Sequence, residues 1–311
     1  MLEKITAHKR IADIVTHVRA FSFPLFVILI LCSCREQVKY DFPDFTPVPT
    51  INSILVAGSK LITQVSLAGK LDTTHLDLVE NAEILIFVND EYTETMTYSD
   101  EGIYTSSVIV EELRTYRCEV NIPGYKTLTC IDSIPKAVEI SNILHIDKAG
   151  KDEEGMTYPA IRFTFENEPS EKLYFEVVIR LIEYGNEQVA DLEAITDPVL
   201  LNEGLPIALF SNETITAHNY TMTLNYFTGG ASSINGGPLQ TNLYPLILEV
   251  RSVSSNYYHF VKQKYLYEKG RYPEFMAAST VAFPLYSNIS GGYGIFAGYS
   301  AFETDTIFPG K

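Results

Sequence analysis

The chain has 311 residues, of which 39 are Asp or Glu and 23 are Lys or Arg, so its formal net charge at pH 7 is −16. A strongly acidic protein repels phosphate backbones, which argues against nucleic-acid binding. Hydrophobic residues make up 46% and charged residues 20% of the chain, values typical of a globular protein with a core. The length suggests two domains of ordinary size.

The first 33 residues have the pattern of an export signal. Residues 1–20 carry four basic side chains against two acidic ones, and an apolar run follows at residues 21–31. This run is shorter than the roughly 20 residues that span a bilayer, and its length fits a signal-peptide core. It ends in Leu31-Cys32-Ser33-Cys34, which resembles the lipobox of bacterial lipoproteins. We therefore predict a signal peptide over residues 1–33 and lipidation at Cys34. Ordinary secretory cleavage or a short retained anchor are the alternatives.

Residues 34–49 are predicted to form a tether between the lipid and the folded part. Pro43, Pro47 and Pro49 lie among polar and aromatic residues without a period of 2 or 3.6. Removal of the slightly basic leader would leave a chain with a net charge of about −18. We expect this acidic body to be held at a membrane by the lipid on Cys34.

Residues 50–135 are predicted to form an antiparallel β-sandwich of the Ig-like or transthyretin-like kind. Short stretches rich in Val, Ile, Thr and Tyr alternate with turn signals such as Gly58-Ser59 and Asn89-Asp90. Gly102-Ile103-Tyr104 and residues 116–125 resemble the last strands of transthyretin-like sandwiches. The predicted strands are residues 51–57, 61–67, 82–89, 92–98, 102–107, 116–122 and 127–134.

Two of the four cysteines remain for pairing once Cys32 leaves with the signal peptide and Cys34 is lipidated. Cys118 and Cys130 flank the turn at Pro123-Gly124, and a three-residue hairpin loop places them opposite each other on one face. We predict a cross-strand disulfide between them, in a compartment that permits disulfides. The alternative is a pair of buried thiols that pack as small hydrophobic groups.

Residues 136–311 are predicted to form a second antiparallel β-domain with one packed helix. Residues 138–146, 160–165, 173–184 and 243–253 alternate as strands, and the acidic stretch 149–155 is expected to be a solvated loop. Ser254 can cap a helix over residues 254–269, on which Tyr258, Val261 and Tyr265 share one face. We expect this face to pack on the sheet, so the chain is predicted to be all-β with one helix.

The sequence carries no strong catalytic or metal-binding motif. His75, His145, His218 and His259 show no paired spacing of the kind that binds zinc. No serine lies in a G-x-S-x-G elbow, and Gly292-Tyr293-Gly294 lacks a correctly spaced third glycine. We predict no metal, no cofactor and no enzymatic activity. A glycan or peptide hydrolase is the alternative, because sequence alone cannot select a catalytic pair among 39 carboxylates.

Several segments of the second half form a recognisable set: DPVL at 197–200, EVRSVS at 249–254, YYHF at 257–260, FPLYSNI at 283–289 and GGYGIFAGY at 291–299. Together they are similar to DUF4249, a family of Bacteroidetes lipoproteins of unestablished function. The resemblance implies an outer-membrane lipoprotein that is often encoded near TonB-dependent receptors. It supplies no catalytic residues. We expect the glycines of 291–299 to permit close backbone packing and its aromatic residues to fill the core.

These observations predict a non-enzymatic, lipid-anchored cell-envelope protein that binds a ligand or a receptor, as an accessory to TonB-dependent uptake. An adhesin or structural surface module is the alternative, which long unpaired edge strands would favour. The resemblance implies that export to the cell surface goes with acidic residues directly after the lipidated cysteine. Arg35-Glu36-Gln37 contains only one such residue after Cys34. The protein could therefore lie on the periplasmic or on the cell-surface side of the outer membrane.

Overall fold

A computed structural model describes residues 46–69, 76–233, 239–270 and 284–310. The predicted signal peptide, Cys34 and the tether up to residue 45 lie outside the described residues. Residues Pro47–Lys311 form one compact unit. No helix within the described residues is long and apolar enough to cross a membrane.

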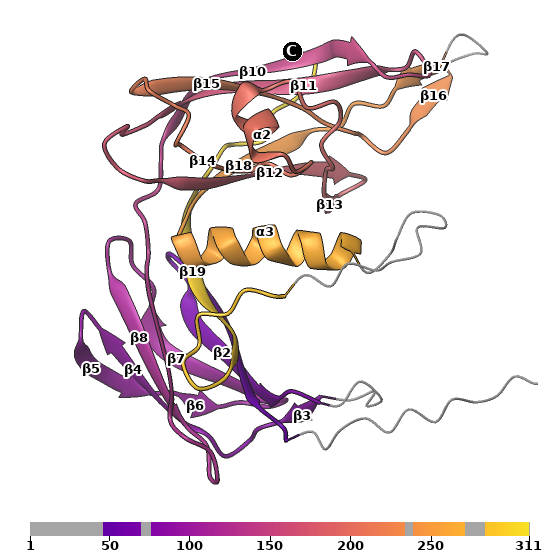
Figure 1. The fold of residues 1–311 in the computed structure, drawn as a ribbon. Coiled ribbons are helices and arrows are strands. Elements are labelled where there is room, and N and C mark those ends of the chain that lie inside the picture. The colour runs from indigo at the N-terminus through magenta and orange to yellow at the C-terminus, as the bar shows by residue number, and fades with distance from the viewer. Residues whose placement is uncertain (1–45, 70–75, 234–238, 271–283, 311) are drawn as a thin grey trace, which may run out of the picture. The chain divides into compact units, whose positions relative to one another are not determined.

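The first part of this unit is a β-sandwich, as predicted (Figure 1). One of its sheets has the strand order β5-β4-β8-β9, and the facing strands β1, β2, β7 and β6 belong to a larger sheet. The strands are β1 (Pro49–Val56), β2 (Lys60–Leu67), β3 (Asp77–Leu78), β4 (Glu83–Val88), β5 (Glu91–Thr95), β6 (Thr97–Tyr98), β7 (Ile103–Ile109), β8 (Thr115–Asn121) and β9 (Leu128–Ser133).

Strict alternation of buried and exposed residues builds the core of the sandwich. Ile51 and Leu55 of β1 point inward, and they meet Ile84 and Ile86 of β4 in one hydrophobic cluster. The strand predicted over residues 92–98 is in fact two strands, because the chain changes sheets at the buried Met96. β5 pairs with β4 in one sheet, and β6 pairs with β7 in the other.

The second part also consists of two packed sheets. The sheet β10-β11-β15 covers the end of the larger sheet that contains β12 and β18, with a second hydrophobic cluster of buried residues. The strands are β10 (Ile140–Lys151), β11 (Thr157–Glu166), β12 (Tyr174–Glu183), β13 (Asn186–Val189), β14 (Leu209–Ser211), β15 (Asn219–Asn225), β16 (Ala231–Ser233), β17 (Leu239–Thr241), β18 (Leu246–Val253) and β19 (Tyr293–Glu303). β10 and β11 extend into the expected acidic loop and reduce it to a turn.

The predicted helix is present as α3 (Ser255–Gly270). Ser254 caps it, since the backbone N–H of Tyr257 donates to Ser254 Oγ at 3.1 Å. Tyr258 and Val261 pack in a third hydrophobic cluster with Tyr174 of β12, which confirms the predicted packing of the helix on the sheet.

A short helix, α2 (Pro198–Glu203), begins within DPVL at 197–200, for which only a similarity to the family was noted and no helix was predicted. Asp197 is its N-cap and accepts a hydrogen bond from the Val199 N–H at 3.0 Å, with Pro198 at the first helical position. Gly204 ends the helix in the left-handed conformation at φ 73°. DPVL contains the helix-start signals, an Asp at the N-cap and a Pro at the first helical position. The helix itself is too short to show a 3.6-residue hydrophobic period.

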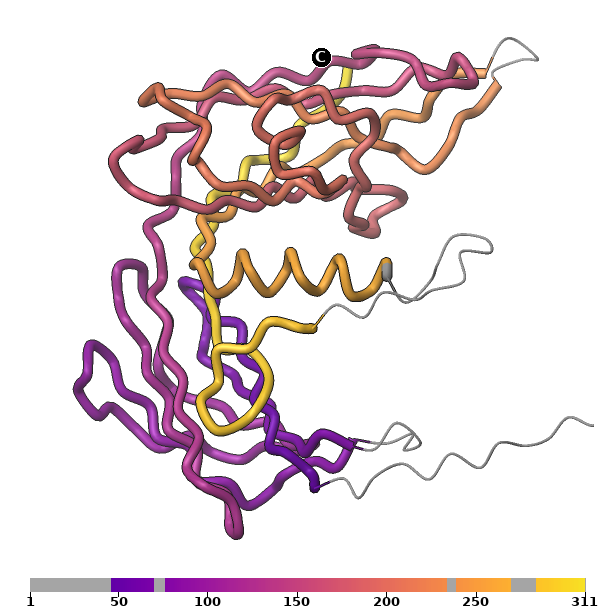
Figure 2. Tube along the Cα trace, in the orientation of Figure 1, coloured from indigo at the N-terminus to yellow at the C-terminus, as the bar shows by residue number. Residues whose placement is uncertain are grey.

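β19 joins the two parts into a single ten-stranded sheet. It pairs in parallel with β1 and antiparallel with β18, and Figure 2 shows this yellow segment running from the indigo strand toward the later strands. A Cβ at Gly294, where φ is 109°, would collide with the Ile51 carbonyl oxygen, so the expected close packing of the glycines is confirmed there. Of the aromatic residues expected to fill the core, Phe296 is fully buried in the sandwich and Tyr299 packs partly buried against the third cluster, but Tyr293 is 57% exposed, so the prediction is wrong for Tyr293. The fold is all-β with packed helix α3, as predicted.

Candidate functional site

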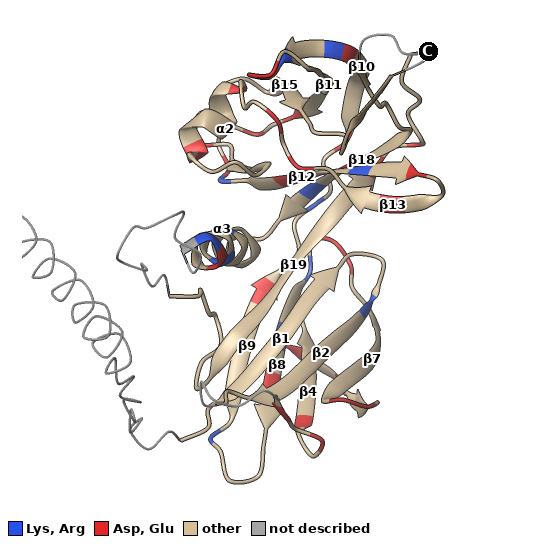
Figure 3. Ribbon diagram, turned by 90° about the vertical axis from the view of Figure 1, so that its right-hand side faces the viewer, with Lys and Arg blue, Asp and Glu red and all other residues tan. Residues whose placement is uncertain are grey.

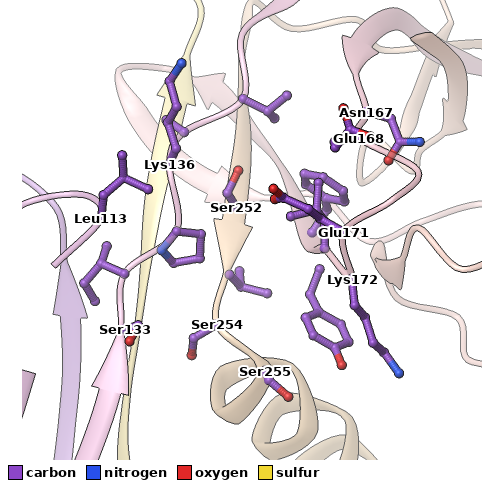
Figure 4. Close-up of a pocket in the computed structure, with 18 of the residues that line it drawn as sticks. Leu113, Ser133, Lys136, Asn167, Glu168, Glu171, Lys172, Ser252, Ser254 and Ser255 are labelled. Carbon is purple, nitrogen blue, oxygen red and sulfur yellow. The ribbon is translucent and has the colours of Figure 1, made fainter. Parts of the chain in front are cut away.

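A groove of about 1200 Å³ lies among the described residues, where β9 leads into β10. Residues 131–139 form its first wall, and residues 166–168, 171–175 and 218–219 form its second. Residues 252–255, between β18 and α3, lie at its base, and Figure 4 shows the open space between these segments. The sequence analysis placed a domain boundary at residues 135–136 but no site there, although binding sites often form at such boundaries.

The first wall is an extended stretch of backbone. Ile134 is still paired, since its N–H donates to the Arg114 carbonyl at 3.0 Å. Pro135 has no N–H, and its carbonyl accepts from Ser300 Oγ at 2.7 Å. Residues 134–139 contain neither a turn nor a bend. Among the described residues, no hydrogen bond satisfies the backbone N–H or C=O groups of Lys136, Ala137 and Val138.

Two buried asparagines hold the second wall in place. Asn167 donates from Nδ2 to the carbonyls of Ile215 and Ala217, at 3.2 and 2.9 Å. Asn212 donates from Nδ2 to Asn167 Oδ1 at 2.8 Å and accepts from the Leu173 N–H at 2.9 Å. Both amides are nearly fully hydrogen-bonded inside the protein, so they fix the loop between β11 and β12.

Asp132 lies in the first wall of the groove, next to its base, and is only 8% exposed. Asn256 donates from Nδ2 to Asp132 Oδ1 at 2.8 Å, and the Gly298 N–H donates to Oδ2 at 2.9 Å. Burial raises the pKa of Asp132 to about 6, against hydrogen bonds from Ser254, Asn256 and Gly298 that favour its charge. The carboxylate thus ties β9 to the start of α3 and to β19, which is a structural role that sequence patterns did not suggest.

The exposed charges of the groove are mostly acidic. Glu139, Glu166 and Glu171 form no ion pair with any described residue, whereas Lys172 is paired with Glu213 at 2.5 Å. In Figure 4, Glu171 points into the open space, while Lys172 and Lys136 point away from it. The groove therefore presents unpaired carboxylates to whatever enters it.

The groove also contains one histidine, His218. His218 is largely exposed and its closest charged partner is Glu168, 3.9 Å away. It makes no hydrogen bond with the groove serines. No group of three or more His, Cys, Asp and Glu side chains in the described part of the chain could hold a metal ion.

The other histidines take structural positions where they are described. His145 forms hydrogen bonds through Nδ1 with Asp147 Oδ1 at 2.8 Å and through Nε2 with the Tyr226 hydroxyl at 2.7 Å. The Tyr226 side chain is fully buried. Burial raises the pKa of Tyr226 well above its usual value, so the hydroxyl stays neutral. His259 packs among tyrosine rings of α3 and β12, and His75 lies outside the described residues.

A second polar cluster lies on the sheet at β12 and β18, where Figure 3 shows acidic and basic residues close together. Glu249 is 3% exposed and accepts from Arg251 Nε at 2.6 Å and from Arg180 Nη1 at 3.0 Å. Arg251 also pairs with Glu176 at 2.8 Å and lies over the Tyr299 ring. The carboxylates are satisfied by these arginines, so the cluster stabilises the sheet rather than forming a site.

The two remaining cysteines lie directly opposite each other on β8 and β9, in the register that the sequence predicted. Both are buried, at 0% and 3% exposure, and their thiols are free in the structure, with Cys130 Sγ 3.8 Å from the Cys118 carbonyl oxygen. Burial raises the pKa of the Cys130 thiol. The register is confirmed, and the disulfide itself stays a prediction.

The fold defines a β-rich protein whose two sandwiched parts share one sheet. The family model of DUF4249, a domain of unknown function, matches residues 35–305, and the chain belongs to this family. No curated protein matches the sequence. Among solved structures, the chain is similar to one described as "Putative membrane anchored protein from Corynebacterium diphtheriae". The two are 9% identical with a TM-score of 0.21, and the match covers 68% of this chain and 55% of that one.

Proposed function

We propose that this protein is a non-enzymatic, lipid-anchored cell-envelope protein that binds a ligand or a receptor through the groove. Its role is that of an accessory to TonB-dependent uptake at the outer membrane. The groove carries this proposal: it offers about 1200 Å³ between two walls, with exposed carboxylates and no nucleophile paired with a base among its described residues. A partner held there is bound rather than cleaved.

The lipid anchor is supported by the sequence around Cys34. The lipobox-like stretch ends at Cys34, and the family match begins at residue 35, directly after it. A single acyl chain binds a membrane only marginally, at about 0.8 kcal/mol per buried methylene, so stable attachment takes more than one chain. A modified Cys34 that carries several chains would hold the protein at the membrane durably.

The position of the groove suits a tethered binding protein. The tether enters at Pro49, the first residue of β1, next to Gly292 and Leu128. The groove lies at the other end of the same strands, where Asp132 of β9 meets Gly298 of β19. The groove therefore lies at the opposite end of these strands from Pro49.

The adhesin alternative requires a long, regular edge strand that accepts a strand from another molecule. β10 is a 12-residue edge strand, but its pairing with β11 shifts register between Ser141 and Leu144 and again between Ile146 and Gly150. Such irregularities protect edges from pairing with other chains. The structure of β10 thus favours the binding proposal over strand exchange along this edge.

Mild extraction of the intact lipoprotein from its own cells tests the proposal. We expect an outer-membrane TonB-dependent receptor to co-purify with the wild-type protein. We expect this receptor to be lost from the variant Glu139→Gln/Glu171→Gln but retained by Glu153→Gln/Glu154→Gln, which removes two charges from the exposed β10–β11 turn. Repeated recovery of the wild-type protein alone would contradict the proposal.

A further inference from the structure

The first wall of the groove offers backbone groups without partners. Lys136, Ala137 and Val138 lie in an extended segment, and Ala137 and Val138 are half-buried. Their N–H and C=O groups form no hydrogen bond with any described residue. Backbone polar groups in folded proteins are nearly always paired, with protein or with water. A short extended segment with free groups is the arrangement to which another extended chain adds as a strand.

The charges of the groove specify the side chains of such a chain. Glu139 belongs to the first wall, Glu166 and Glu171 belong to the second, and all three are exposed. None of them has a basic partner among the described residues: Lys172 is already paired with Glu213, and the side chain of Lys136 points away from the open space (Figure 4). Alternate side chains of an extended peptide point to opposite faces. Lys or Arg at every second position would therefore face these carboxylates.

We propose that the groove binds an extended, basic peptide segment of a partner protein by β-strand addition to residues 136–138. The peptide backbone pairs with the free N–H and C=O groups of this segment, and its basic side chains face Glu139, Glu166 and Glu171. This inference rests on the proposed function only in taking the groove as the contact site, and it adds the chemistry of the partner. Main-chain hydrogen bonds give the affinity, and the carboxylates select against acidic segments.

Peptide binding to the full-length protein in a neutral detergent tests the proposal directly. The probes are three fluorescein-labelled eight-residue peptides: alternating Lys and Val, alternating Glu and Val, and the Lys-Val peptide with alternate backbone nitrogens methylated. Fluorescence anisotropy at low salt measures their affinities. We expect the unmodified basic peptide to bind at least ten-fold more tightly than either of the others. Equal affinities, or no binding of the basic peptide at millimolar concentration, would overturn the proposal.

Hydrogen exchange locates the contact. We expect the amides of residues 136–138 to exchange at least ten-fold more slowly when the basic peptide is present, because strand addition pairs them. Unchanged exchange at these residues would refute strand addition even if the peptide bound elsewhere. Protection of the same amides by a neutral oligosaccharide, without protection by the peptide, would assign the groove to a different ligand class and would also refute it.

Matched charge variants test the acidic walls. Glu139→Gln/Glu171→Gln and the control Glu153→Gln/Glu154→Gln each remove two negative charges from exposed positions, so their effect on the net charge is equal. Exposed ion pairs are individually weak and the variant removes two of them, so we expect the groove variant to bind about 2- to 30-fold more weakly and the control to change less than about 2-fold. Equal losses of peptide affinity in the two variants would show that net charge alone causes the effect, and this would contradict the proposal.

The two proposals can fail separately. Receptor co-purification that depends on the groove, combined with failure of every peptide, would refute only the inference about the partner. Peptide binding without a receptor would refute only the accessory role in uptake.

Discussion

The buried carboxylate of Asp132 leads to a specific expectation about stability and pH. Its side chain lies between β9, the start of α3 and β19, at 8% exposure. Burial raises the pKa of this group from 3.8 to about 6 in the folded protein. The substitution Asp132→Asn keeps the size of the side chain and removes its titration.

The magnitude follows from the difference between the two pKa values. Each pKa unit equals about 1.4 kcal/mol, so ionising Asp132 costs about 3 kcal/mol more in the folded protein than in the unfolded chain. Between about pH 4 and pH 6 the folded protein keeps a proton that the unfolded chain releases. This contribution therefore lowers the unfolding free energy as the pH rises through that window, and the loss is complete above about pH 6.

The assay compares the unfolding free energies of wild-type protein and Asp132→Asn by urea titration, followed by tyrosine fluorescence and circular dichroism. The Asn side chain also changes the hydrogen bonds with Asn256 and Gly298. This effect is independent of pH, so it does not alter how the difference in unfolding free energy between the two proteins varies with pH. We expect the variant to gain about 3 kcal/mol relative to wild type between pH 4 and pH 7. The control Asp100→Asn, in an exposed turn, should show no such gain. A flat difference for Asp132→Asn, or a gain in the opposite direction, would refute the reasoning.

Three further predictions concern the anchor, the cysteines and the buried ion pairs. Cys34→Ser should move the protein from the membrane fraction to the soluble fraction in cell fractionation, because the acyl chains are lost; a variant retained in the membrane would contradict lipidation. Protein isolated from the envelope and denatured without reductant should show no reactive thiol, and two titratable thiols per chain would disprove the disulfide. Replacing Cys118 and Cys130 by Ala should lower the unfolding free energy by about 2–3 kcal/mol. Glu249→Ala should cost about 3–5 kcal/mol in urea unfolding, since it leaves two half-buried arginines short of a partner. Glu213→Ala, in an exposed pair with Lys172, should cost less than about 1 kcal/mol, and a similar cost for both would argue against the ion-pair cluster.

Local patterns in the sequence predicted much of the fold. Strands such as β1 and β8 alternate buried and exposed residues with a period of 2, and turn residues mark their ends. The turn signal at Pro123-Gly124 was enough to predict the register of β8 and β9, and so to place Cys118 opposite Cys130, although residues 122–127 separate the strands where a three-residue loop was expected. These features depend on neighbours within about fifteen residues, which a sequence pattern can report.

The candidate site could not be found in this way, because it depends on contacts between distant segments. The walls of the groove come from residues 131–139 and 166–175, and its base comes from residues 252–255. Asp132 was one of 39 acidic residues until the fold brought Asn256 and Gly298 to its two oxygens. Only the Pro135 boundary hinted that the two parts of the chain meet there.

The sequence by itself determined the export pattern at Cys34, the family, the all-β class, the packed helix and the register of the cysteine hairpin, because each is encoded in adjacent residues or in a short period. Only the tertiary structure decided that β19 completes the first sandwich and joins both parts into one sheet. Parallel pairing of β19 with β1 links residues more than 240 positions apart. Such pairing is selected by the packing of the whole core, and no local pattern reports it. The same packing places the unpaired backbone of residues 136–138 beside the loop between β11 and β12 and so creates the groove.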